Sequence, residues 1–106
     1  KQLLEHNPKM TAVFVSNYEM TMGAVIAANE LGLRIPEDLS VIGFDNLEFA
    51  RACIPKLSIV TQPTKEIGRR AADLMLRKLE GEIPLEERVN VKLGTDFVEG
   101  RTIKKR

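Results

Sequence analysis

The order of apolar and polar residues in the first half of the chain predicts a strand, a helix and a second strand. Residues 11–15 (TAVFV) and 40–44 (SVIGF) are short runs rich in β-branched and aromatic side chains, which favour buried strands. Residues 18–31 between them have helical length, and Gly32 stands where helices commonly end. Short connections between these elements predict a right-handed parallel β-α-β unit.

The second half of the chain continues this alternation. Residues 57–61 (LSIVT) form a third apolar run, and residues 64–80 place apolar side chains at helical spacing with charged residues between them. Residues 49–56 predict a loop. Residues 88–93 and 95–98 alternate in the manner of strands, with Gly94 between them. Strands that alternate with helices predict an α/β fold with a parallel sheet.

The helix expected at residues 18–31 is apolar on nearly every side. A helix that covers one face of a sheet needs only an apolar stripe, yet Met22 and Ile26 are offset from Val25 and Ala28. Two arrangements would explain this second apolar surface. The helix either contacts another chain or is buried on both sides within its own monomer.

Polar side chains follow two of the predicted strands directly. Asp45 comes after residues 40–44, and Asn17 comes after residues 11–15. Ligands of open parallel sheets bind beyond the carboxyl ends of the strands, so we expect both side chains at one rim. A carboxylate accepts hydrogen bonds and an amide both donates and accepts, which suits sugar hydroxyls or the ring nitrogens of a base. The alternative for Asp45 is a turn or cap residue without a ligand.

Composition and charge exclude several other kinds of site. Sixteen basic and fifteen acidic residues give a net charge of +1, too small to favour binding to nucleic acid. Cys53 is the only cysteine and His6 the only histidine, so we expect no disulfide, no zinc site and no nucleophile paired with a base. The phosphate, dinucleotide and metal motifs are missing as well. We therefore expect a protein that is not an enzyme and carries no cofactor.

The chain also shows no segment typical of a membrane protein. No apolar run approaches the roughly 18 to 20 residues that cross a bilayer, and the first ten residues do not resemble a secretory leader. We expect a soluble, cytoplasmic protein.

Two segments resemble a known family, the LacI/GalR transcriptional regulators. They are TAVFVSNYEMTMGAVIAANELGLRIPEDLSVIGFDN and LSIVTQPTKEIGRRAADLMLRKLEGE. Their blocks are Asn-x-Glu-Met-x-x-Gly, Gly-Leu-x-x-Pro-Glu-Asp, Gly-Phe-Asp-Asn and Gln-Pro, and they are similar to the C-terminal part of the effector-binding core of that family. The resemblance implies a type I periplasmic-binding-protein-like fold, of which only the C-terminal portion is present. In such proteins two α/β subdomains are joined by crossing strands and close on a small effector.

The resemblance also implies a division of the chain. Residues 1–62 correspond to part of the C-terminal effector-binding subdomain, and residues 63–93 to a helix and strand of the other subdomain. Residues 94–106 correspond to the returning strand and a tail. The helix after Gln62-Pro63 would then leave its apolar face exposed or find a different partner.

Site residues follow from the resemblance position by position. Asp45 matches the acidic residue that hydrogen-bonds the effector, Asn17 matches the polar residue of the preceding strand end, and Gln62 matches a pocket residue at the strand crossing. Tyr18 departs from the Asp common at its position, which puts the local hydrogen bonding around Asn17 in question. The resemblance also implies a homodimer, with these interface candidates: Met22, Ile26, Phe49 and Ile54.

The implied function is an effector-sensing and dimerisation module of a bacterial LacI/GalR-type regulator. The effector would be a sugar, a nucleobase or another small metabolite, and operator DNA would be bound only through an N-terminal domain that these residues do not include. An alternative is a solute-binding protein of the same fold that serves a sugar transporter. An enzyme with Asp45 as acid or base is disfavoured because no second titratable group accompanies it.

Overall fold

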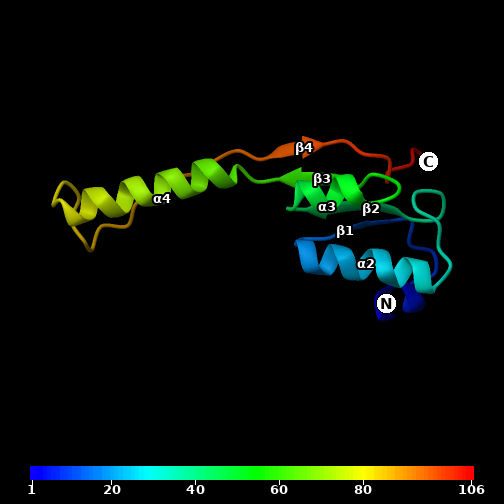
Figure 1. Ribbon diagram of the computed structural model, residues 1–106. Coiled ribbons are helices and arrows are strands. Elements are labelled where there is room, and N and C mark those ends of the chain that lie inside the picture. The colour runs from blue at the N-terminus through cyan, green and yellow to red at the C-terminus, as the bar shows by residue number, and fades with distance from the viewer. The chain divides into compact units, whose positions relative to one another are not determined.

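Strands and helices alternate along the chain, as the sequence predicts. The computed structural model describes residues 1–106 (Figure 1). The elements in chain order are α1 (Gln2–His6), β1 (Ala12–Phe14), α2 (Tyr18–Glu30), β2 (Ser40–Phe44), α3 (Leu47–Ala52), β3 (Ser58–Thr61), α4 (Thr64–Leu79) and β4 (Asp96–Val98). Contacts divide the chain into two compact units, residues 1–61 with 97–106 and residues 62–96.

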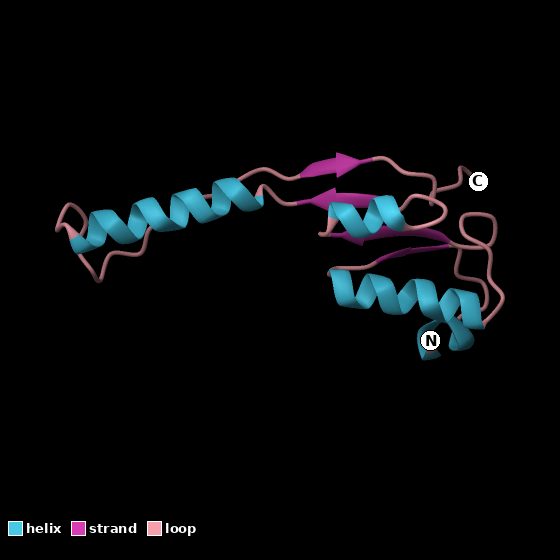
Figure 2. Cartoon of the chain, viewed as in Figure 1, coloured by secondary structure: helices cyan, strands magenta, loops and turns pink.

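The sheet has the strand order β1-β2-β3-β4. β1 pairs with β2 in parallel, with Phe14 opposite Ile42, and β2 pairs with β3 in parallel, with Phe44 opposite Val60. In Figure 2 the arrow of β4 points opposite to that of β3. The expected α/β fold with a parallel sheet is confirmed, and β4 is added at one edge.

The core of the first unit lies between the sheet and the helices α2 and α3. Right-handed crossovers that advance in one direction along a sheet place their helices on one face, where Figure 1 shows α2 and α3. Gly43 allows this packing, because a Cβ at this position would lie 2.8 Å from Thr21 Cγ2 and 3.0 Å from Leu57 Cδ2. The buried cluster consists of Ala28, Leu39, Val41, Ala50, Leu57 and Ile59.

The C-terminal segment is bonded across the starts of two strands. The hydroxyl of Thr102 donates to the Val41 carbonyl at 2.6 Å and accepts from the Ser58 amide at 2.9 Å. The Ser58 hydroxyl accepts from the amide of Gly100 at 2.9 Å, and the Ser40 hydroxyl accepts from the amide of Lys104 at 3.0 Å. The tail expected after the returning strand is therefore attached to β2 and β3.

Two sequence-based predictions are wrong. Residues 49–56, expected as a loop, begin inside the helix α3, which Asn46 caps by accepting from the Phe49 amide at 3.0 Å. Residues 88–93, expected as a strand, have no regular structure. A segment with alternating apolar and polar residues forms a strand only where a neighbouring strand supplies hydrogen bonds. The second unit contributes only one residue, Asp96, to the sheet.

The second unit consists of Gln62 and Pro63, the helix α4 and the residues that follow it to Asp96. Charged side chains bond along α4, where Glu66 accepts from Arg69 at 2.6 Å and from Arg70 at 2.9 Å. The Lys78 ammonium donates to the Glu87 carbonyl at 2.6 Å, which holds the following turn against the helix. No residue of α4 is buried. Its exposed large apolar side chains are Ile67, Met75, Leu76 and Leu79.

Candidate functional site

Asn17 precedes the first residue of α2 and lies three residues beyond the end of β1. Its backbone is extended and its side-chain oxygen accepts from the amide of Met20 at 2.9 Å, which makes it the N-cap of the helix. Asparagine is among the preferred N-cap residues because its oxygen replaces a partner that the first helical amides lack. Since Oδ1 is used in this way, the amide nitrogen of Asn17 is the group that can donate to a ligand.

Asp45 lies directly beyond β2 in an unusual backbone conformation. Asp45 has φ 68° and Asn46 has φ 61°, a left-handed region that Asp and Asn tolerate better than most other residues. The amide of Asp45 donates to the Val60 carbonyl at 2.9 Å. Two successive residues in this region turn the chain sharply from β2 into α3, and such outliers often occur at functional sites.

The strand register brings Asn17 and Asp45 to neighbouring positions at one edge of the sheet. Phe14 pairs with Ile42, and each candidate lies three residues beyond its member of that pair. The bond from the Val15 amide to the Ile42 carbonyl, 2.9 Å long, continues this register past the end of β1. The common edge expected from the sequence is therefore present.

An aromatic pair connects the two helices that start at this edge. The rings of Tyr18 and Phe49 meet edge to face, with centroids 5.0 Å apart and an interplanar angle of 74°. Tyr18 follows Asn17 in the first turn of α2, and Phe49 is in the first turn of α3. This contact cannot be predicted from the sequence, because it depends on how the two helices pack and no local pattern indicates it.

Gln62, the third candidate, follows β3 and is the first residue of the second unit. It is half-buried. Gln62 belongs to a different unit from Asn17 and Asp45.

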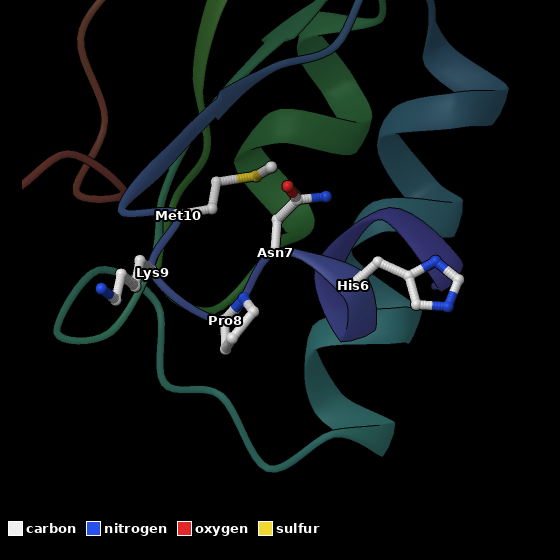
Figure 3. Close-up of a pocket in the computed structure, with 5 residues that line it drawn as sticks. All are labelled: His6, Asn7, Pro8, Lys9 and Met10. Carbon is white, nitrogen blue, oxygen red and sulfur yellow. The ribbon is translucent and has the colours of Figure 1, made fainter.

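Two hollows of the first unit lie apart from these residues. Figure 3 shows a hollow formed by residues 6–10, with the His6 ring turned away from the side chains of Lys9 and Met10. This turn precedes β1 and is thus at the amino ends of the strands. A second hollow lies along β1 and α2, and Ser16 is among the residues that line it. Neither is lined by Asn17 or Asp45, so we define the candidate site by the strand ends.

No group of three or more His, Cys, Asp or Glu residues could hold a metal ion. Cys53 is half-buried, and this burial raises the pKa of its thiol, so it is neutral and weakly nucleophilic at neutral pH. None of the helices combines the length and the apolar character needed to cross a bilayer.

The interface candidates differ in exposure. Ile54 is 99% exposed, Ile26 50% and Met22 38%. Phe49 is half-buried and its ring contacts Tyr18 of the same chain. Three of the four side chains are thus accessible to a partner, and the fourth already has an internal contact.

Comparisons with known proteins show the family of the chain. A family model described as a periplasmic binding protein-like domain matches residues 1–103. The HTH-type transcriptional repressor PurR of Edwardsiella ictaluri is 37% identical over 103 residues, which cover 97% of this chain and 30% of that repressor.

Solved structures are similar over nearly the whole chain. The transcriptional regulator CelR in complex with cellobiose has a TM-score of 0.87 and 32% identity, and the match covers 95% of this chain and 30% of CelR. The Lac repressor dimer bound to operator and the anti-inducer ONPF has a TM-score of 0.80 and 32% identity, again with 95% and 30% covered. The chain thus spans less than a third of the length of these proteins. It belongs to the periplasmic-binding-protein-like domain family, in the group that contains the LacI-type transcriptional repressors.

Proposed function

We propose that the chain is the effector-sensing and dimerisation module of a bacterial LacI/GalR-type transcriptional regulator in the cytoplasm. The observation that carries this proposal is the common position of Asn17 and Asp45 at the carboxyl ends of two paired parallel strands, where open α/β sheets bind their ligands. The similarity to PurR, CelR and the Lac repressor supports a regulator rather than an enzyme.

The chemistry of the two side chains suggests a neutral ligand rich in hydroxyl groups. The carboxylate of Asp45 accepts hydrogen bonds, and the amide nitrogen of Asn17 donates them because its oxygen caps α2. A sugar hydroxyl does both at once, since it can donate to Asp45 and accept from Asn17. A nucleobase or nucleoside offers a similar pairing. We include Gln62 as a third contact, and the cellobiose bound by CelR supports the sugar class.

We further propose that residues 63–93 belong to a second subdomain, that residues 1–62 belong to the effector-binding one, and that residues 94–106 are the returning strand and the tail. The chain passes from one unit to the other at Thr61–Gln62 and returns at Asp96–Phe97. A ligand that contacts both subdomains favours one relative arrangement only by binding it more tightly than the other. In a dimer, this preference changes the spacing of the attached DNA-binding domains and thus the affinity for operator DNA.

The dimer of this proposal uses the exposed side of α2 and the end of α3. Met22, Ile26 and Ile54 supply exposed apolar surface, and Phe49 adds its half-buried ring. Two-fold interfaces place the same patch of each copy against its counterpart. The dimeric state of the Lac repressor supports this proposal.

Thermal unfolding of the full-length protein tests the ligand assignment. The ligands are cellobiose, ribose, lactose and adenosine, each added to the wild type and to Asp45→Asn. This variant keeps the shape of the side chain and tolerates φ 68°. A ligand at a hundred times its Kd adds about 2.7 kcal/mol to the stability of the wild type. We expect Asp45→Asn to bind the stabilising ligand more weakly, to lose most of this gain and to keep its affinity for operator DNA.

Glu37→Gln is the matched control. It removes the same charge from an exposed residue in the loop before β2, at the opposite ends of the strands, and should behave like the wild type. An equal ligand response of wild type and Asp45→Asn would refute the assignment of Asp45. The alternative of a solute-binding protein predicts ligand binding by a full-length protein that does not bind DNA, and turnover of a sugar would indicate an enzyme.

A further inference from the structure

We propose that the Tyr18–Phe49 ring pair is a positioning element that sets the orientation of Asp45 relative to Asn17. This inference rests on the proposed function, because it assigns the two rings to the same site. Neither ring is proposed to touch the ligand. Their part is to hold together the two helix starts from which the ligand-binding side chains project.

Each ring belongs to a residue that is connected to the site, Tyr18 directly through the chain and Phe49 through Asn46. Tyr18 is bonded to Asn17 in the chain and begins α2. Phe49 is connected to the Asp45 turn by hydrogen bonds, because its amide donates to the Asn46 side chain at 3.0 Å. The next amide, that of Ala50, donates to the carbonyl of Asn46 at 3.1 Å. A displacement of Phe49 therefore moves Asn46, and Asp45 with it.

The turn formed by Asp45 and Asn46 has a strained backbone. Asp45 and Asn46 both have positive φ, a conformation that persists only where the surrounding structure fixes it. The bonds from Asn46 to the first turn of α3 fix one side of this turn, and the Asp45 amide bond to Val60 fixes the other. The position of α3 then decides where the Asp45 carboxylate points.

Both rings are half-buried. Phe49 packs against the buried cluster of the first unit, whereas Tyr18 is not among the residues that do. The edge-to-face geometry is the favoured one for two aromatic rings, and it fixes their relative orientation as well as their distance. Tyr18 can therefore be changed to test positioning with little disturbance of the core.

Hydrogen exchange of the full-length protein tests the inference without any ligand. Tyr18→Leu keeps an apolar side chain and removes the ring, while Tyr18→Phe keeps the ring. We expect faster exchange of the peptide that covers residues 44–52 in Tyr18→Leu, and wild-type exchange in Tyr18→Phe. Phe97→Leu, which removes an exposed ring from β4, is the control and should leave this peptide unchanged.

A double-mutant cycle of affinity separates positioning from a general loss of stability. Calorimetric titration with cellobiose, ribose, lactose and adenosine is made with the wild type, Tyr18→Leu, Asp45→Asn and the double variant. We expect Tyr18→Leu to weaken binding by roughly two- to tenfold, the range of aromatic pair contributions. In the Asp45→Asn background the same change should have little further effect, since its route to the ligand is already lost.

The two hypotheses fail in different ways. Unchanged exchange at residues 44–52 in Tyr18→Leu would overturn the positioning role, whatever the titrations give. The positioning role would also be overturned if Tyr18→Leu reduced the affinity equally in the wild type and in Asp45→Asn. Binding that does not respond to Asp45→Asn would instead refute the proposed function, while the exchange result would still decide whether the ring pair holds the turn.

Discussion

Single residues with little or no side chain decide how closely the elements of the first unit approach one another. A Cβ on Gly43 would meet the side chains of Thr21 and Leu57. A Cβ on Gly100 would meet backbone atoms, the Lys56 carbonyl oxygen and the Leu57 carbonyl group. Side chains can move and backbone cannot, so Gly100 is the less replaceable of the two. It lies in the segment that is bonded to Ser58.

The contact at Gly43 leads to a prediction with an internal compensation. Gly43→Ala places a methyl group 2.8 Å from Thr21 Cγ2, and we expect a loss of about 1–3 kcal/mol in the free energy of unfolding, as for other overpacked cores. Thr21→Ser removes that methyl group and keeps the hydroxyl that donates to the Asn17 carbonyl at 2.6 Å. The double variant should therefore lose less free energy of unfolding than the sum of the losses in the two single variants.

Urea unfolding of the four proteins measures this coupling. Gly23→Ala is the matched control, since a Cβ there has no atom within 4 Å and Gly23 lies inside α2. It should stabilise the helix by roughly 0.5–1 kcal/mol. Additive losses for Gly43→Ala and Thr21→Ser would show that the methyl contact does not cause the destabilisation.

At the scale of residues, the sequence was informative where the chemistry is local. The positions of Asn17 and Asp45 at the strand ends could be predicted because Asp45 directly follows an apolar run and Asn17 follows one after Ser16, and parallel strands share their carboxyl edge. The positive φ of Asp45 and Asn46 had a signal in the residue types themselves. The roles of Thr102 and Ser58 had none, because their hydrogen bond joins residues 44 positions apart in the chain.

Elements with a strong periodic pattern were predicted with nearly their observed bounds, and elements that depend on neighbours were not. β2 was expected at residues 40–44 and is found at Ser40–Phe44, and α2 was expected at 18–31 and is found at Tyr18–Glu30. The six residues of α3 are too few to show a helical period, and Asn46 was the only signal of its start. Residues 88–93 alternate as a strand does but are not paired.

The start of α4 leads to a prediction about pH. Hydrogen bonds from Arg70 and Arg69 hold the pKa of Glu66 below its usual value. A carboxylate with a depressed pKa stabilises the folded state above its unfolded pKa and loses this contribution as the pH falls through the folded one. Glu66 also lies in the first turn of α4, where a negative charge interacts favourably with the positive end of the helix dipole. The N-terminal turn of α4 should therefore weaken on acidification.

An NMR titration of the Glu66 carboxyl carbon measures this pKa directly. Arg70→Gln should raise it more than Arg69→Gln, because the bond from Arg70 makes the larger contribution. Arg77→Gln removes a charge that pairs with Asp73 at 3.1 Å and serves as the control. Both arginine side chains are more than half exposed, so added salt should reduce the effect. A Glu66 pKa that is unaffected by both substitutions would contradict the role of the two arginines.

For the molecule as a whole, the two units differ in how much of their surface is buried. The first unit has a buried cluster that includes Val41 and Ile59, both fully buried, between the sheet and two helices. The second unit has a long helix without a single buried residue. The apolar stripe of this helix was expected from the sequence, because its apolar residues recur at helical spacing. The apolar face of α4 is exposed in this chain.

Hydrogen exchange of the 106-residue chain should reveal this difference. A helix of 16 residues is marginal in water unless tertiary packing supports it, so the amides of α4 should exchange through local opening and be weakly protected. The amides of Val41 and Ile59 should exchange only with unfolding of the first unit. Low concentrations of urea should accelerate the exchange of the Val41 and Ile59 amides and leave the exchange of the α4 amides almost unchanged.

If the exposed face of α4 is covered by a second copy of the chain, the protection of the α4 amides will rise with protein concentration. Protection of α4 equal to that of Ile59 at the lowest protein concentration would contradict the exposure of this face.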